Sequence, residues 1–211
     1  MARYLLLVQL LCLAASVQAN GVLILGDSIS AAYGIEKSSG WVALMDRQLK
    51  ERCPDFPVIN ASVSGETTAG GKSRLPTLLA RHKPDLVVVE LGGNDGLRGL
   101  SPRIMANNLE QMISLSRQAE ADVVLLGMRI PPNYGQQYTA LFERQYRDVS
   151  QSTSVPWVPF FLEGVIEQGW MQGDGIHPTI EAQPLLLETA LSVIETQLPS
   201  RCRSHISTET E

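Results

Sequence analysis

The sequence predicts one α/β domain, a parallel five-stranded sheet with helices on both faces. Short apolar runs of four to six residues alternate with longer segments of helical spacing, and this alternation is typical of βαβ units. The 211 residues fit a single domain of this kind. Neither an internal repeat nor a Gly/Ser-rich linker divides the chain, so one domain is the simplest organisation.

The five expected strands are continuous apolar runs, as in strands that are buried on both faces. The third is the clearest, because only Glu90 interrupts its aliphatic residues. In chain order the runs lie at residues 22–25, 58–63, 86–91, 123–128 and 155–160. Ligands bind at the carboxyl ends of the strands of such a sheet, so the residues just after each run are the first candidates for a site.

The expected helices fill the segments between these strands. Apolar residues recur at helical spacing from Trp41 until Pro54 stops the helix, and a shorter helix surrounds Leu75. Ser101 and Pro102 are typical of a helix start, because serine caps the first turn and proline fits its first position. The next helix should therefore begin at Pro102.

Two further helices and a tail complete the expected domain. Residues 138–150 have helical spacing, and Thr179 is expected to cap a last helix whose buried face includes Leu186 and Ile194. From Pro199 onward the chain is polar, and we expect a loose tail.

The charge pattern excludes some classes of partner. The net charge is −5, and no run of Lys or Arg exceeds two residues. Nucleic acids and anionic membrane surfaces attract clustered positive charge, so neither is an expected partner. The three histidines are far apart, and no cysteine or histidine group has the spacing of a zinc site. We therefore expect no metal ion.

Residues 1–19 are expected to be a secretory signal peptide. Arg3 gives a positive start, residues 4–15 are almost all apolar, and Val17 and Ala19 are small residues ahead of a cleavage site. A buried N-terminal helix is the alternative. The apolar run is shorter than the ~20 residues that span a bilayer, so no stable membrane anchor is expected. The sequence thus predicts export to the periplasm or the medium.

Ser28 is the first candidate for a catalytic residue. It lies in the segment Gly-Asp-Ser-Ile-Ser directly after the first expected strand, where a side chain is held rigidly at the functional edge of the sheet. A nucleophile needs that rigidity. A turn or helix cap made from glycine, aspartate and serine is the plain alternative, and the segment lacks the Gly-x-Ser-x-Gly pattern of α/β-hydrolases.

Asp174 and His177 lie together in the loop before the last expected helix. A histidine that acts as a base needs a partner that fixes its tautomer and stabilises its charged form. An aspartate three residues earlier can supply that partner, while Gly175 lets the loop bend and Pro178 stiffens its exit. An Asp-Gly turn beside an exposed, idle histidine is the alternative.

Gly65 and Asn94 follow the second and third expected strands. An asparagine amide and a backbone N–H at a glycine can both donate to a developing oxyanion. A turn explains each segment equally well when it is taken alone. Together with Ser28, Asp174 and His177, however, these residues supply a nucleophile, a base, an orienting acid and oxyanion donors at one edge of the sheet. The combination predicts a serine hydrolase.

The sequence resembles the SGNH (GDSL-type) hydrolases, whose four signature residues match Ser28, Gly65, Asn94 and His177 in order and spacing. The resemblance runs over residues 22–198. It implies a flavodoxin-like three-layer fold without a cofactor. It also implies Asp174 as the third catalytic residue, and an oxyanion hole formed by the Ser28 and Gly65 backbone N–H groups with the Asn94 side chain. The hydrolase domain is then 20–200, after the signal peptide 1–19 and before a tail at 201–211.

The resemblance further implies that the substrates are small acyl esters, thioesters or lysophospholipids, cleaved by a monomer through an acyl-enzyme on Ser28. Ile130 and Pro131, in the loop after the fourth expected strand, are candidates for an acyl pocket, and their apolar side chains favour an acyl chain over a sugar. Plain packing explains the same residues. A carbohydrate esterase that removes acetyl groups therefore remains the main alternative within the family.

Two alternatives come from other classes of protein. Residues 65–73 end in Gly-Lys-Ser like a phosphate-binding loop, but Glu66 stands where that motif requires glycine, and its carboxylate would repel phosphate. A nucleotide-binding protein is therefore a remote alternative. A non-catalytic binding module on the same fold is the other, since a fold does not determine a function.

Cys53 and Cys202 are the two cysteines that remain after removal of the signal peptide. An even pair in an exported protein permits a disulfide, and two free thiols are the alternative. In the flavodoxin-like sheet implied by the resemblance, the first and last helices lie side by side on one face. The two sulfurs, which lie near the ends of these helices, would then be able to meet.

Overall fold

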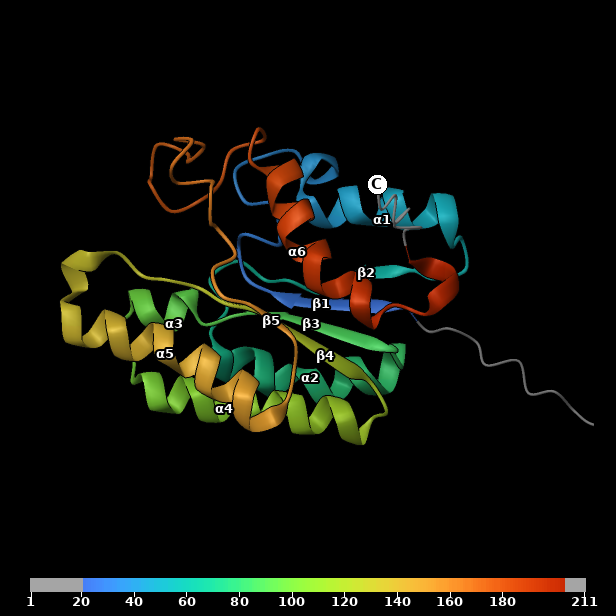
Figure 1. The fold of residues 1–211 in the computed structure, drawn as a ribbon, viewed down its shortest axis with the longest axis horizontal. Coiled ribbons are helices and arrows are strands. Elements are labelled where there is room, and N and C mark those ends of the chain that lie inside the picture. Colours follow the sequence, from blue (N-terminus) through green and yellow to red (C-terminus); the bar gives the residue numbers. More distant parts are fainter. Residues whose placement is uncertain (1–20, 204–211) are drawn as a thin grey trace, which may run out of the picture.

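The computed structural model describes residues 21–203. The expected signal peptide and residues 204–211 lie outside this described part of the chain. Within it, the expected α/β architecture is confirmed as a three-layer arrangement, with a twisted sheet between two layers of helices (Figure 1).

All five strands of the sheet are parallel, in the order β2-β1-β3-β4-β5. The strands are β1 (Val22–Gly26), β2 (Val58–Asn60), β3 (Leu86–Glu90), β4 (Asp122–Leu126) and β5 (Trp157–Val158). The order reverses at β1, which lies between β2 and β3, so the crevice at the carboxyl ends of β1 and β3 is where such a sheet binds ligands.

Two helices cover one face of the sheet and three cover the other (Figure 1). The first pair is α1 (Trp41–Arg52) and α6 (Gln183–Gln197), and the other layer is α2 (Thr68–His82), α4 (Pro102–Gln118) and α5 (Gln136–Thr153). A short helix, α3 (Gly93–Leu97), follows β3, and 3₁₀ turns lie at Lys37–Ser39, Pro132–Tyr134 and Ser200–Cys202.

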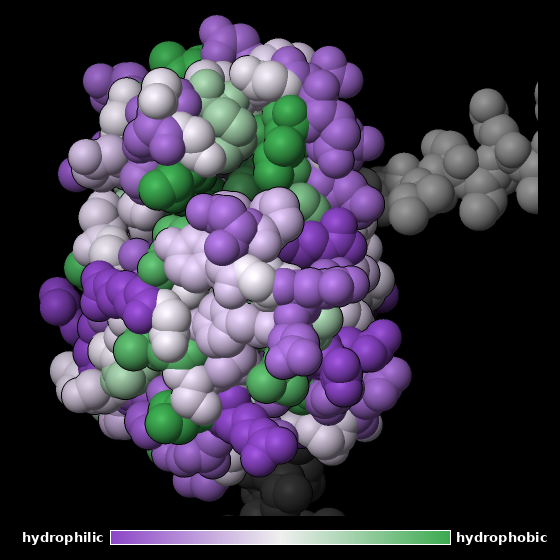
Figure 2. All heavy atoms as spheres, turned by 90° about the vertical axis from the view of Figure 1, so that its left-hand side faces the viewer, coloured by the Kyte–Doolittle hydropathy of each residue, from purple (hydrophilic) through white to green (hydrophobic). Residues whose placement is uncertain are grey.

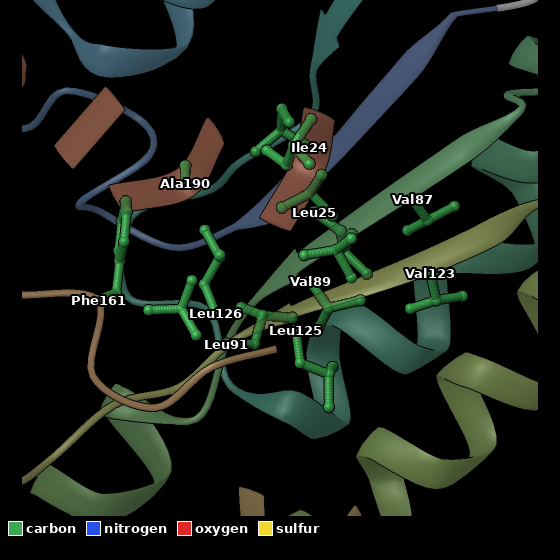
Figure 3. Packing of buried hydrophobic residues seen from close by; sticks show 14 of the residues in the cluster. Ile24, Leu25, Val87, Val89, Leu91, Val123, Leu125, Leu126, Phe161 and Ala190 are labelled. Atoms are coloured by element: carbon green, nitrogen blue, oxygen red, sulfur yellow. The ribbon is translucent and has the colours of Figure 1, made fainter. Parts of the chain in front are cut away.

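The core is built from the two faces of the central strands. Neighbouring strands place Leu25 beside Val89 and Val89 beside Leu125, so these side chains share the face that packs on α2, α4 and α5. The alternate residues of the same strands face α1 and α6, and Figure 3 shows Leu126 and Phe161 below Ala190 of α6. The burial on both faces explains why the strands are continuous apolar runs.

The edge strands are shorter than expected, for reasons that the sequence contains. β5 covers only Trp157–Val158 because prolines stand at 156 and 159, and proline has no N–H to donate to a ladder. β2 ends at Asn60, whose side-chain amide donates to the Ser30 carbonyl and whose Oδ1 accepts from the Ser62 N–H. These side-chain bonds stand beside two further backbone bonds to β1, from the Ala61 N–H to the Ile24 carbonyl and from the Val63 N–H to the Gly26 carbonyl.

Two expectations about helices are wrong. Asn94 was expected in a loop but lies in the first turn of α3. Thr179 does not cap the last helix, because turns occupy residues 180–182 and α6 starts at Gln183, with Pro184 in its first turn.

The segment that resembles a phosphate-binding loop is part of α2. Lys72 donates to Asn108 Oδ1 at 2.6 Å, and Gly71 packs so tightly on the sheet that a Cβ there would lie 2.3 Å from Leu91 Cδ1. The Gly71 N–H is already bonded to the Thr67 carbonyl. Helix packing therefore explains this Gly-Lys-Ser segment, and the helix leaves no loop of free N–H groups for a phosphate.

Cys53 and Cys202 form a disulfide that joins the end of α1 to the segment after α6. Cys202 is buried, and Arg203 donates to the carbonyls of Thr196 and Leu198. The segment from Pro199 to Arg203 therefore packs on the domain, which differs from the loose tail that its polar sequence predicted.

Candidate active site

The residues singled out in the sequence meet at one edge of the sheet, where the strands end. Ser28 follows β1, Gly65 follows β2, Asn94 follows β3, and Asp174 and His177 lie in the long loop between β5 and α6. Figure 2 looks onto this side of the molecule and shows hydrophobic side chains gathered around a hollow in its upper half.

Ser28, His177 and Asp174 form a continuous chain of contacts. His177 Nε2 lies 2.9 Å from Ser28 Oγ, and His177 Nδ1 lies 2.6 Å from Asp174 Oδ2. This is the geometry in which an imidazole takes a proton from a hydroxyl while a carboxylate fixes its tautomer. Segments nearly 150 residues apart in the chain are brought into contact here.

The loop of Asp174 and His177 is organised by its own hydrogen bonds. Asp174 Oδ1 accepts from the backbone N–H groups of Ile176 and His177, at 2.9 and 3.0 Å. The contacts to the His177 side chain and backbone, followed by the Ile176 N–H, hold the pKa of the Asp174 carboxyl well below its ordinary value. The Asp174 carboxylate is therefore charged at any pH at which His177 can act as a base. The ring of Tyr33 packs against the imidazole of His177, with ring centroids 4.4 Å apart.

Within the described chain, two backbone N–H groups of the site are free, one in the Ser28 turn and one at Gly65 after β2. Asp27 Oδ1 accepts from the Ile29 N–H at 3.0 Å and so holds the turn around the serine. Within residues 21–203, the N–H groups of Ser28 and Gly65 donate to no protein acceptor. Gly65 has a φ of +77°, which favours glycine, and the Arg98 guanidinium donates to its carbonyl.

Asn94 is oriented by a buried aspartate. Its amide nitrogen donates to Asp27 Oδ2 at 2.9 Å, which leaves the second hydrogen of the same nitrogen for another acceptor. Burial raises the pKa of Asp27 to about 6, against the lowering effect of the Ile29 N–H and then of the Asn94 amide. Free donors from Ser28, Gly65 and Asn94 on three neighbouring segments are what an oxyanion hole requires.

A pocket of about 480 Å³ opens beside Ser28 and His177. Its walls are mostly apolar, and they include Ile130 and Pro131. The other aliphatic, aromatic and sulfur-containing residues of the lining are Ile29, Leu97, Met128, Pro132, Phe160, Leu162, Ile166, Met171 and Ile176. A pocket of this composition binds an apolar ligand next to a polar reacting group.

The comparisons with known proteins agree with this geometry. A profile of the GDSL-like lipase/acylhydrolase family matches residues 24–183. The chain belongs to this family. The GDSL-like match covers the elements from β1 to the start of α6, and so includes every residue of the Ser28–His177–Asp174 chain.

Three relatives in this GDSL-like family have named activities. The esterase TesA of Pseudomonas aeruginosa is 54% identical over 81% of this chain and 85% of its own length. An arylesterase of Vibrio mimicus is 47% identical over 89% of this chain and 95% of its own length. The thioesterase 1/protease 1/lysophospholipase L1 of Escherichia coli is 43% identical over 81% of each chain. This GDSL-like chain is accordingly an ester hydrolase.

Solved structures give the same result. A crystal structure of TesA, 51% identical, covers 84% of this chain and 99% of its own with a TM-score of 0.81. The psychrotrophic esterase EstA from Pseudoalteromonas, in a structure inhibited by monoethylphosphonate, is 39% identical. It covers 84% of this chain and 97% of its own, with a TM-score of 0.79.

All of the GDSL-type site residues expected from the sequence lie at this edge. Sequence reasoning missed Asp27, which orients Asn94, and Tyr33, which packs on His177. It also missed the wall of the pocket from Phe160 to Ile176, although part of that wall follows β5 and obeys the same rule of strand ends. Within the described residues, no group of three or more His, Cys, Asp or Glu side chains is placed to hold a metal ion.

Proposed function

We propose that this GDSL-like hydrolase cleaves acyl esters and thioesters through an acyl-enzyme on Ser28. The observation that carries the proposal is the contact chain from Ser28 through His177 to Asp174 at the mouth of an apolar pocket. A serine hydroxyl is a weak nucleophile, and a base within hydrogen-bond distance activates it.

In the first half of the reaction, His177 takes the Ser28 proton while the serine oxygen attacks the acyl carbonyl. Asp174 stabilises the imidazolium that forms, because its carboxylate is already charged and lies against Nδ1. The imidazolium then gives its proton to the leaving alcohol or thiol. In the second half, His177 takes a proton from water while the water oxygen attacks the acyl carbonyl. The ester bond to Ser28 then breaks, the imidazolium returns its proton to the serine oxygen, and the acid leaves.

The negative oxygen of each tetrahedral intermediate would lie among the Ser28 N–H, the Gly65 N–H and the Asn94 amide. Within residues 21–203, these groups donate to no other protein acceptor, apart from the one Asn94 hydrogen that is bonded to Asp27. Because they are oriented before the reaction, they stabilise the charge without a cost of reorganisation.

The apolar walls of the pocket favour an acyl chain as the part of the substrate that is recognised. Ile130 is almost fully buried in the wall, while Pro131 lies at the exposed rim. Each methylene that is buried there contributes about 0.8 kcal/mol. A sugar acetyl ester would leave these walls uncovered and would need polar partners instead.

A series of p-nitrophenyl esters from acetate to decanoate, with matching acyl-CoAs, tests this proposal. The value of kcat/KM should rise with chain length up to medium chains, and Ile130→Ser should flatten the rise, because each methylene then gains less than about 0.8 kcal/mol. Ile104→Ser, at an exposed isoleucine of α4 outside the pocket lining, is the matched control and should keep the slope. A preference for acetyl esters, or for acetylated sugars alone, would favour a carbohydrate esterase instead.

We also propose that the hydrolase domain, residues 20–200, acts after export. The anatomy of residues 1–19 and the disulfide of the folded domain both support an oxidising compartment outside the cytoplasm. Within residues 21–203, no helix is long and apolar enough to cross a membrane. Mass spectrometry of the periplasmic fraction tests the proposal, and the expected product starts at Asn20 and retains the disulfide.

A further inference from the structure

Two buried carboxyl groups lie side by side beneath the Ser28 turn. Glu90 ends β3 and is fully buried, and Asp27, the residue after β1, is 2% exposed. Strands β1 and β3 are neighbours, and Gly26 stands opposite Glu90 in their register. Glu90 takes no part in the steps described above, yet a buried carboxyl is costly and requires an explanation.

Every hydrogen bond of the Glu90 side chain within residues 21–203 goes to the Ser28 turn. Its Oε2 accepts from the Asp27 backbone N–H at 3.2 Å and from the Ser30 hydroxyl at 2.7 Å. The Ser30 oxygen in turn accepts from the Trp41 indole N–H at 3.2 Å. Oε1 of Glu90 has no hydrogen-bond partner. Glu90 therefore ties both sides of the nucleophile to the core.

The hydrogen bonds favour a neutral Glu90 beside a charged Asp27, because both oxygens of Asp27 accept hydrogen bonds whereas Glu90 Oε1 accepts none within residues 21–203. An unpartnered oxygen in the core costs far less on a neutral acid than on a carboxylate. Burial, and then the neighbouring Asp27, raise the pKa of Glu90 well above its ordinary value, whereas the pKa of Asp27 is raised only to about 6. The titratable groups that face the pair from other elements are His177 and, from α5, Tyr146.

The charge on Asp27 selects one orientation of the Asn94 amide. A carboxylate only accepts hydrogen bonds, so it holds the amide nitrogen and repels the amide oxygen. A protonated Asp27 would also accept the flipped amide, because its O–H can donate to the amide oxygen. A second charge on Glu90 would add to the repulsion of an oxyanion at the site.

We propose that Glu90 is a positioning residue of the oxyanion hole. As a neutral acid it holds the Asp27 turn and leaves the charge on Asp27, whose carboxylate keeps the Asn94 amide in its donating orientation. This role rests on the proposed function of Asn94 as an oxyanion donor. Glu90 itself does not touch the reacting atoms.

Infrared spectroscopy tests the protonation of Glu90 without reference to catalysis. The wild-type spectrum at pH 8 should contain the C=O stretch of a protonated carboxylic acid, and Glu90→Gln should remove it. Asp27→Asn is the matched control and should keep this band at pH 8. Spectra of wild type and Glu90→Gln without such a difference would mean that Glu90 is ionised, and this would overturn the proposal.

A double-mutant cycle tests whether Glu90 acts through Asn94. Glu90→Leu should lower kcat about 100-fold with KM changed less than about threefold, and Glu90→Gln should restore kcat to within about threefold of wild type. In an Asn94→Ala background, Glu90→Leu should lower kcat less than about threefold, because the group it positions is gone. Val88→Ala, buried on the same face of β3, should lower the melting temperature and leave kcat within about twofold.

Each outcome of the cycle is decisive. Equal losses from Glu90→Leu in both backgrounds would mean a general structural role and would overturn the proposal. Full kcat in Asn94→Ala alone would overturn the proposed oxyanion role of Asn94, and the positioning role with it. If Glu90→Leu fails to fold, Glu90→Met, which is closer to glutamate in shape, replaces it in the cycle, and the same loss of effect in the Asn94→Ala background is expected.

Discussion

The two halves of the active site are held in place in different ways. The half with Ser28 and Asn94 rests on the core, because Asp27 and Glu90 beneath it are almost completely buried and bond across β1 and β3. The half with His177 is a surface loop, in which 40% of the Asp174 side chain is exposed. The hydrogen bonds of the Asp174 carboxylate reach residues no more than three positions away in the chain.

Because of this difference, substitutions in the two halves should affect catalytic activity and folding stability differently. A substitution in the loop removes a catalytic group without opening the core, so it should change kcat and leave the fold intact. A substitution beneath the serine changes buried charges and hydrogen bonds, so it should change both quantities.

The largest effect is expected in the loop. His177→Ala and Asp174→Ala should each lower kcat by a factor on the order of 10⁴, because the members of a catalytic triad act as a unit. Their urea unfolding curves should stay close to that of the wild type. His82→Ala, at the far end of α2, is the control and should keep full activity. A large loss of stability in either loop variant would contradict the comparison.

The disulfide should show the opposite behaviour. Its two cysteines are separated by 149 positions, so the double variant Cys53→Ser/Cys202→Ser should lose roughly 2–5 kcal/mol of unfolding free energy. The value of kcat should not change, because the C-terminal ends of α1 and α6, which the disulfide joins, lie away from the reacting groups. Urea unfolding with and without reductant measures the first quantity. A tenfold loss of kcat in the folded variant would show that the loop of His177 depends on this tether.

Asn94→Ala should lower kcat by a factor of about 10²–10³, which corresponds to about 3–4 kcal/mol of transition-state stabilisation. The KM value should change little, since the amide acts on the charge that develops in the transition state. Asn107→Ala on the exposed side of α4 is the control. A raised KM with an unchanged kcat would remove Asn94 from the oxyanion hole.

The smallest effect concerns the pH dependence of stability beneath the serine. The pKa of Asp27 is about 6 in the folded protein against an ordinary value of 3.8, so between these pH values the folded state keeps a proton that the unfolded state has lost. This group therefore stabilises the fold below pH 3.8, and its contribution falls by up to roughly 3 kcal/mol as the pH rises to 6. Asp27→Asn should remove this fall in urea unfolding experiments. A fall of equal size in the variant would assign it to another group.

The sequence predicts the architecture well because the central strands are buried on both faces, which produces unbroken apolar runs such as that of β3. The same rule of strand ends predicts Ser28, Gly65 and Asn94. The length of β5 and the start of α6 are less predictable, since proline positions and local turns decide them.

The support beneath the site could not be predicted from the sequence. Glu90 in an apolar run gives no sign of its partners, because these are set by the register of β1 and β3 and by the packing of Trp41. The contact of Tyr33 with His177 likewise depends on two loops that are distant in the chain. Such contacts follow from the fold and not from local spacing.

Labelling of the nucleophile tests directly whether the reaction passes through an acyl-enzyme on Ser28. A fluorophosphonate probe should attach to one residue, identified as Ser28 by mass spectrometry of the peptides, and activity should disappear in proportion to labelling. Ser28→Ala should take up no probe and should lose kcat by a factor on the order of 10⁴, with an unchanged unfolding curve. Labelling at another serine, or more than about a tenth of wild-type activity in Ser28→Ala, would contradict the acyl-enzyme mechanism.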